Sequence, residues 1–219
     1  MSGINQKTFT AAIASGFYNL ACGETISTLD SNLTDDQLRV METEACGLPS
    51  FFFREIDGWQ NTKRTTLFPK GSAHYPLGLF GHFLLPTPER WTPNINRFLN
   101  HTQSVVQGAA REVNLPRDID TLLNWTPNRV GLNLMRGNLE HEAKIPKHTD
   151  PLTETGLVIA LELIGSSAGK MSMIFSADVC ATLGLERPEH EVTSFTDRMS
   201  LTLANLQAER PDVIPGDWS

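Results

Sequence analysis

The sequence contains few cysteines, and their spacing carries no motif. Cys22, Cys46 and Cys180 are an odd number, and no two of them have the CxxC spacing. This argues against a disulfide framework and against a zinc knuckle. Because free cysteine usually behaves as a small apolar residue, we expect these thiols to be buried.

Long apolar runs and runs of basic residues are also missing. The longest apolar stretch, around residues 157–163, contains Glu162 and falls far short of the roughly 20 residues that a membrane-spanning helix needs. The net charge is −7, and no basic run is longer than a pair such as Lys63 and Arg64. We therefore expect neither nucleic-acid nor membrane partners. The first residues lack the basic and apolar regions of a secretory signal, which favours a cytoplasmic protein.

A chain of 219 residues is long enough to bury a substantial core, and its length does not require two domains. We therefore expect a single domain over residues 1–219. Residues 1–128 are expected to form helices and irregular segments. From Arg129 onward the residue pattern changes to short runs that are typical of β-strands.

Two helices are indicated in the first part of the chain. Thr34 and Gln37 form a capping-box pattern, which predicts a helix over residues 35–46. Thr92 followed by a proline predicts an N-cap and the first residue of a second helix, and apolar residues keep a helical spacing as far as Val113.

The second part of the chain has the pattern of several short strands separated by Gly, Pro and Ser clusters. The expected strands cover residues 129–136, 145–150, 155–163, 171–175, 189–193 and 198–205. Six short strands in succession suggest a barrel or jelly roll rather than alternating strands and helices. The predicted fold class is therefore α+β, with N-terminal helices packed on a jelly-roll core.

Three residues in this part are candidate metal ligands. Side chains alternate along an extended strand, so His148 and Asp150 project to the same side. His190, from a distant strand, is the candidate third ligand. Two neutral imidazoles and one carboxylate form the facial triad that suits iron(II), because three adjacent coordination positions stay open.

The last expected strand carries a candidate anion site. Alternation places Arg198, Ser200 and Thr202 on one face and apolar residues on the other. A guanidinium matches a carboxylate in bidentate fashion, and the serine hydroxyl adds a donor. The distal carboxylate of 2-oxoglutarate is the ligand expected for such a pair.

The order of His148-x-Asp150, a distal His190 and Arg198-x-Ser200 resembles the iron(II)- and 2-oxoglutarate-dependent oxygenases, particularly the branch similar to isopenicillin N synthase. The resemblance covers residues 129–215, and it implies that this part is a double-stranded β-helix core carrying the metal and 2-oxoglutarate sites. The segment 129–135 resembles a strand that carries an Asn and a Tyr in the family. It implies a cosubstrate-binding role for Asn133 and places Met135 where many relatives have the tyrosine.

The resemblance implies an oxidoreductase that uses Fe(II), 2-oxoglutarate and O2 to oxidise a C–H bond. Hydroxylation is the expected outcome, and cyclisation or desaturation would use the same iron site. The short N-terminal part favours a small-molecule substrate, such as an amino acid or an intermediate of natural product biosynthesis.

Three alternatives remain open from the sequence. The first is an Fe(II) oxidase of the same fold that does not use 2-oxoglutarate, because such relatives retain the Arg-x-Ser pair. The second is a non-catalytic jelly-roll binding module in which the histidines and Arg198 are structural. The third is a cupin-type lyase or isomerase, whose ligand sets usually include more histidines and a glutamate.

Overall fold

A computed structural model describes residues 6–50, 53–67, 92–113 and 119–206. The helices are α1 (Gln6–Ala21), α2 (Asp35–Cys46), α4 (Pro93–Glu112), α5 (Asp120–Leu123) and α6 (Ala177–Leu183). The strands are β1 (Ser27–Asp30), β2 (Arg54–Glu55), β3 (Thr62–Leu67), β4 (Arg129–Arg136), β5 (Ala143–His148), β6 (Glu154–Ile164), β7 (Lys170–Phe175), β8 (His190–Ser194) and β9 (Asp197–Leu206).

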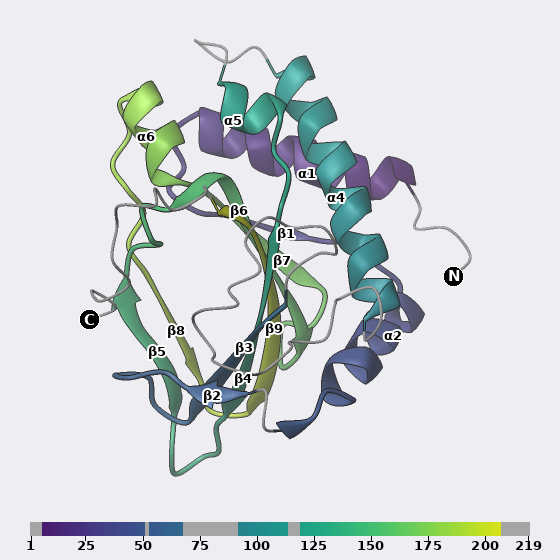
Figure 1. Cartoon of the computed structure of the whole chain (residues 1–219), viewed down its shortest axis with the longest axis vertical. Coiled ribbons are helices and arrows are strands. Elements are labelled where there is room, and N and C mark those ends of the chain that lie inside the picture. Colours follow the sequence, from purple (N-terminus) through teal and green to yellow (C-terminus); the bar gives the residue numbers. More distant parts are fainter. Residues whose placement is uncertain (1–5, 51–52, 68–91, 114–118, 207–219) are drawn as a thin grey trace, which may run out of the picture.

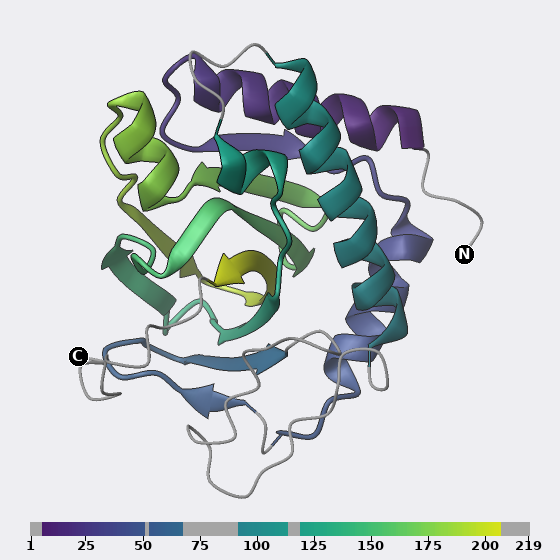
Figure 2. The same cartoon turned by 45° about the horizontal axis from the view of Figure 1, so that its top comes forward.

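The strands form one large and one small antiparallel sheet. The large sheet has seven strands in the order β1-β7-β6-β9-β4-β3-β2, and the small sheet pairs β5 with β8. In Figure 1 the small sheet faces one side of the large sheet, and α1, α4 and α2 lie on the other side of the large sheet. Figure 2 shows α1 and α4 running along this outer layer. The helices and the space between the two sheets therefore lie on opposite sides of the large sheet.

The main hydrophobic core fills the helix-covered side of the large sheet. Side chains of α1 and α4, such as Phe9, Phe17 and Phe98, are buried against apolar residues of β6, β7 and β9. The alternation predicted for the last strand is confirmed there. Met199, Leu201 and Leu203 belong to this core, whereas the intervening polar residues line the space between the sheets. Burial of one face therefore sets which side chains reach the cavity.

Residues before position 129 contribute strands as well as helices. β1 pairs with β7 at one edge of the large sheet, and β3 pairs with β4 near the other edge. The sequence left open whether the aromatic-rich segments of this region form coil or strands, and it did not assign β1 or β3. Both pairings join segments that are far apart in the chain, which a local pattern does not report.

The two predicted helices are present, and their N-termini are capped differently. In α2, the Thr34 hydroxyl accepts from the Gln37 backbone N–H, and the Gln37 side chain accepts from the Thr34 backbone N–H. Thr92 is the N-cap of α4 and a proline is its first residue, as predicted, but the Thr92 side chain makes no capping hydrogen bond. The Glu44 carboxylate of α2 instead accepts from the backbone N–H groups of Asn94 and Ile95, at 2.9 and 3.1 Å.

Replacing Glu44 with alanine is expected to lower the free energy of unfolding by about 1–2 kcal/mol, because two N–H groups and the positive end of α4 lose their acceptor. Urea titration followed by circular dichroism measures this. Glu42 lies two positions before Glu44 on the same helix. Glu42→Ala is therefore the matched control and should change stability by less than about 0.5 kcal/mol. Equal losses in both variants would contradict the capping role.

The prediction of buried thiols is only partly right. Cys180 is buried, but Cys22 and Cys46 are exposed, and none of the three forms a disulfide. The two exposed cysteines lie at helix ends, since Cys22 follows α1 and Cys46 is the last residue of α2. Among the described residues, no helix combines the length and apolar character needed to cross a membrane.

Candidate metal centre

The structure brings His148, Asp150 and His190 together. Their candidate ligand atoms lie within 4.8 Å of one another, and no other group of three or more metal-binding side chains is found in the described part of the chain. The β5–β8 pairing causes this, because His148 and His190 are direct partners in the ladder. Their ring centroids are 4.3 Å apart, and His190 Nε2 lies 3.8 Å from Asp150 Oδ1.

Asp150 reaches the cluster from outside the strand. The sequence predicted a strand over residues 145–150, but β5 ends at His148 and has an irregularity in its pairing after Ile145. Asp150 precedes Pro151, and a residue before proline is disfavoured in the helical region of the backbone. Arg187 also donates to the Asp150 carbonyl at 2.6 Å. The segment is thereby held near the histidines without a partner strand.

The protonation states suit a cation. Burial lowers the pKa of His190, and the nearby His148 lowers it further, while Asp150 acts in the opposite direction. His190 is therefore neutral at physiological pH, as a ligand must be. His148 Nδ1 lies 2.8 Å from the Pro146 carbonyl oxygen. A proton on Nδ1 would donate to that carbonyl and leave Nε2 free to bind a metal.

Unsatisfied polar atoms indicate that the cluster is incomplete without a ligand. Asp150 Oδ2 and His190 Nδ1 are buried and have no hydrogen-bond partner among the described residues. A buried carboxylate oxygen without a partner is costly. A divalent cation between the three side chains would satisfy the carboxylate, and two imidazoles with one carboxylate match the donor set of an iron(II) facial triad.

The predicted anion site lies in the same cavity. Arg198 and Ser200 line it together with the three candidate ligands, as does Asn133 from the neighbouring β4. Asn133 is the ladder partner of Ser200, and its amide nitrogen lies 3.4 Å from the Ser200 hydroxyl. The side-chain carbonyl oxygen of Asn133 is buried and has no hydrogen-bond partner in the described part of the chain.

Arg198 has a partner that the sequence did not reveal. Its Nε donates to Glu162 Oε2 at 2.7 Å. The acidic residues nearest to it in the sequence, Asp197 and Glu191, pair with Arg136 and Lys144 respectively. Glu162 is almost fully buried on β6, where it lies opposite Ser200. No sequence signal marks this contact, because Glu162 stands inside an apolar run 36 residues earlier.

Arg198 retains donors beyond the Glu162 contact. The contact uses only Nε, and Nη1 lies 3.4 Å from the sulfur of Met135. A guanidinium has five N–H donors, so the remaining ones are available to a carboxylate. The Met135 side chain therefore lies against the guanidinium.

Two further arginines line the cavity and were missed from the sequence. Arg129 forms an ion pair with Glu154, and both side chains are largely buried. Arg64 comes from β3, whose pairing with β4 brings it beside Asn133. In the sequence, Arg64 stands out only as one of a basic pair with Lys63. That pair does not indicate a binding site.

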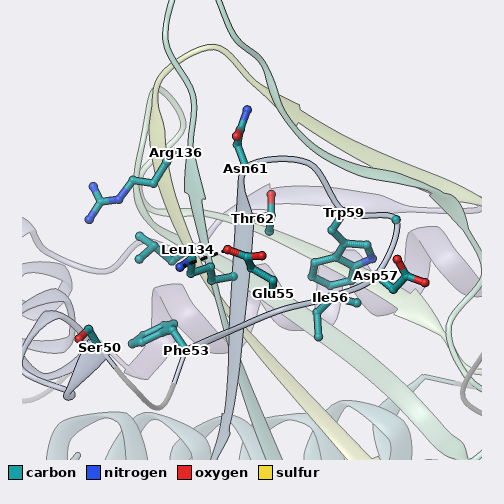
Figure 3. Close-up of a pocket in the computed structure, with 12 residues that line it drawn as sticks. Ser50, Phe53, Glu55, Ile56, Asp57, Trp59, Asn61, Thr62, Leu134 and Arg136 are labelled. Carbon is teal, nitrogen blue, oxygen red and sulfur yellow. Dashed lines mark ion pairs between the residues drawn. The ribbon is translucent and has the colours of Figure 1, made fainter.

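A second, larger hollow lies at the edge of the large sheet near β2 and β3, with a volume of about 770 Å³. Figure 3 shows Glu55, Ile56 and Trp59 around it, with an ion pair between Lys63 and Glu55. It contains none of the three candidate ligands. Trp59 lines both this hollow and the metal cavity.

No family model matches the sequence, and no curated protein matches it. The structure, however, is similar to several solved ones. A Pseudomonas putida prolyl-4-hydroxylase superposes with a TM-score of 0.55 at 13% identity, covering 89% of this chain and 99% of that protein. The chain shares the fold of an oxygenase.

Two other solved structures support the same fold. A prolyl hydroxylase from Trichoplax adhaerens, in complex with a hypoxia inducible factor peptide, has a TM-score of 0.59 at 10% identity and covers 92% of this chain and 90% of its own. The dioxygenase for auxin oxidation 1 from Arabidopsis thaliana, in complex with 2-oxoglutarate, has a TM-score of 0.55 at 12% identity, with coverages of 95% and 91%. The predicted double-stranded β-helix of the oxygenase fold is confirmed, with helices packed on it.

Proposed function

We propose that this protein is an oxygenase that uses Fe(II), 2-oxoglutarate and O2 to oxidise a C–H bond of a small molecule. The convergence of His148, Asp150 and His190 inside the cavity of an oxygenase fold carries the proposal. The fold alone does not imply an activity, but a facial triad at this place in the fold is a specific chemical arrangement. The ordered motifs of the isopenicillin N synthase-like branch support the same assignment.

His148, Asp150 and His190 would hold the iron. Iron(II) with bound 2-oxoglutarate and O2 supplies the oxidation of an unactivated C–H bond. Two imidazoles and one carboxylate would leave coordination positions for a bidentate ligand and O2. Asp150 would compensate part of the metal charge, and the Pro146 carbonyl would orient His148.

Arg198, Ser200 and Asn133 would bind the distal carboxylate of 2-oxoglutarate. The free donors of Arg198 and the Ser200 hydroxyl supply charge-assisted hydrogen bonds. Glu162 holds the guanidinium through Nε, so it acts as a positioning residue for Arg198. The apolar walls of the cavity, which include Val158 and Ile174, exclude water from the reacting atoms.

The small-molecule class and hydroxylation as the default outcome belong to this proposal. Among the similar structures, one binds a peptide and another is a dioxygenase for auxin oxidation, so the shared fold serves both kinds of substrate. The size of the metal cavity, about 160 Å³, favours the smaller class.

Anaerobic addition of Fe(II) and 2-oxoglutarate to the purified protein tests the proposal. We expect a weak visible charge-transfer band from the chelate. Arg198→Ala should need at least about tenfold more 2-oxoglutarate to reach half of the full band, because it loses charge-assisted hydrogen bonds. Arg136→Ala, an exposed arginine on the neighbouring strand, is the control and should behave like the wild type. A wild-type protein without the band contradicts the proposal.

The pairing of Arg198 with Glu162 favours one alternative, an Fe(II) oxidase that does not use 2-oxoglutarate. This pair is neutral overall, so it attracts a dianionic cosubstrate less than a lone arginine does. Succinate formation coupled to substrate oxidation distinguishes the two functions. Substrate oxidation that consumes O2 without succinate would establish the alternative.

A further inference from the structure

Arg64 is the arginine of the metal cavity that lacks a carboxylate partner. Three arginines line this cavity, and two of them are already paired: Arg129 with Glu154, and Arg198 with Glu162. Within the described residues, the Arg64 guanidinium has neither an ion pair nor a hydrogen bond. Arg64 is partly buried, and a cation withdrawn from water without a partner is costly unless a ligand supplies the opposite charge.

The surroundings of Arg64 hold its guanidinium in one place. Its Cζ lies 5.8 Å from the centre of the Trp59 ring, within the range of a cation–π contact. On another side, the guanidinium packs against Gly131 of β4. A Cβ atom at Gly131 would lie only 2.6 Å from Arg64 Nη2, so the glycine provides the space that the guanidinium occupies.

The charges nearby place the guanidinium at the metal end of the cavity. Burial lowers the pKa of Arg64 to about 10, and the positive charge of Arg129 contributes to the lowering, while Glu154 and Asp150 raise it. The side chain therefore keeps its charge at neutral pH. Arg64 and the candidate metal ligand Asp150 line the same cavity, so a molecule bound by Arg64 would share that cavity with the metal site.

Arg64 and Arg198 serve different parts of the cavity. Arg198 is the ladder partner of Met135, while the Arg64 guanidinium lies over Gly131. Four residues along a strand correspond to about 13 Å. The two guanidiniums therefore lie near positions of β4 that are four residues apart.

We propose that Arg64 binds a carboxylate of the primary substrate, which makes the substrate class small carboxylic acids with an apolar body. A single unpaired positive charge suits a monoanion, and the fork of N–H donors matches a carboxylate. Val158, Ile174 and Val192 line the same cavity and provide apolar contact for the rest of the molecule. This inference rests on the oxygenase function proposed above, since that function makes the bound acid a substrate.

Titration calorimetry with benzoate and its uncharged analogue benzamide tests the proposal on the full chain. Both probes are added to the metal-free protein and, anaerobically, to protein loaded with Fe(II) and 2-oxoglutarate. We expect the wild type to bind benzoate more tightly than benzamide. Arg64→Met should weaken benzoate binding at least about tenfold in both states and leave benzamide unchanged, because a charge-assisted contact is lost.

Two further variants separate the role of Arg64 from general charge effects. Lys63→Met removes a charge from the next residue of β3, whose side chain is exposed outside the cavity, and should bind benzoate as the wild type does. Gly131→Ala keeps the Arg64 charge but displaces the guanidinium, so it should also weaken benzoate binding. The melting temperature of Arg64→Met should equal or exceed that of the wild type, because a partly buried cation without an ion-pair partner among the described residues is removed.

Three outcomes would overturn this inference: no benzoate binding by the wild type, equal benzoate binding by Arg64→Met, or a variant that instead needs more 2-oxoglutarate to form the visible band. The last would assign Arg64 to the cosubstrate. Failure of the proposed oxygenase function is a different result, since the band would be missing in the wild type while Arg64-dependent benzoate binding to the metal-free protein persists.

Discussion

His148→Ala is expected to lose bound iron and to lower O2-dependent consumption of 2-oxoglutarate at least about 1000-fold. A facial triad without one imidazole holds the metal weakly, and a loss of several kcal/mol of metal-based stabilisation corresponds to about three powers of ten in rate. Iron content per chain after desalting, together with O2 uptake and succinate formation, measures the effect.

His141→Ala is the matched control for this experiment. His141 is an exposed histidine in the loop between β4 and β5, close in sequence but outside the cluster. Its replacement should leave iron content and succinate formation unchanged. If His148→Ala retained as much iron as the control, the three side chains would not be the metal ligands, and the proposed function would lose its main support.

Glu154→Gln is expected to lower the free energy of unfolding by about 3–5 kcal/mol, because it leaves the buried Arg129 charge uncompensated. Burial raises the pKa of Glu154, whereas the positive charge of Arg129 lowers it. The charged form of Glu154 in the interior therefore depends on Arg129. The loss is increased by Arg64, whose positive charge also lies close to this pair. Urea titration measures the change in unfolding free energy.

An exposed ion pair provides the comparison. Lys63 and Glu55 are 3.4 Å apart, and both side chains are at least half exposed, so Glu55→Gln should cost no more than about 1 kcal/mol. A double variant, Arg129→Met with Glu154→Leu, should recover most of the stability, since it removes both charges from the interior. If Glu154→Gln lowered the free energy of unfolding no more than Glu55→Gln does, water would compensate the charge of Arg129.

Local sequence patterns predicted the elements that depend on local physics. The α2 helix has the predicted bounds because its capping box involves residues three positions apart. The β4 strand also has its predicted bounds. The strand β9 was found because one face must be apolar, and this alternation correctly placed Arg198 and Ser200 in the cavity. Their roles toward 2-oxoglutarate remain predictions.

Contacts between distant segments were beyond those patterns. β3 shows no strong alternation, and it becomes a strand because β4 offers its hydrogen-bonding edge. The cap of α4 comes from Glu44, about 50 positions earlier, rather than from the neighbouring Thr92. Glu162 lies in an apolar run, where its pairing with Arg198 leaves no local trace.

The sequence by itself determined which side chains are candidates to bind iron and a carboxylate, because ligand chemistry and strand alternation depend on residue type and spacing. Only the tertiary structure decided which of the charged residues are already paired. Ion pairing depends on distances across the sheets, and these distances leave Arg64 as the unpaired cation beside the metal centre in the described part of the chain.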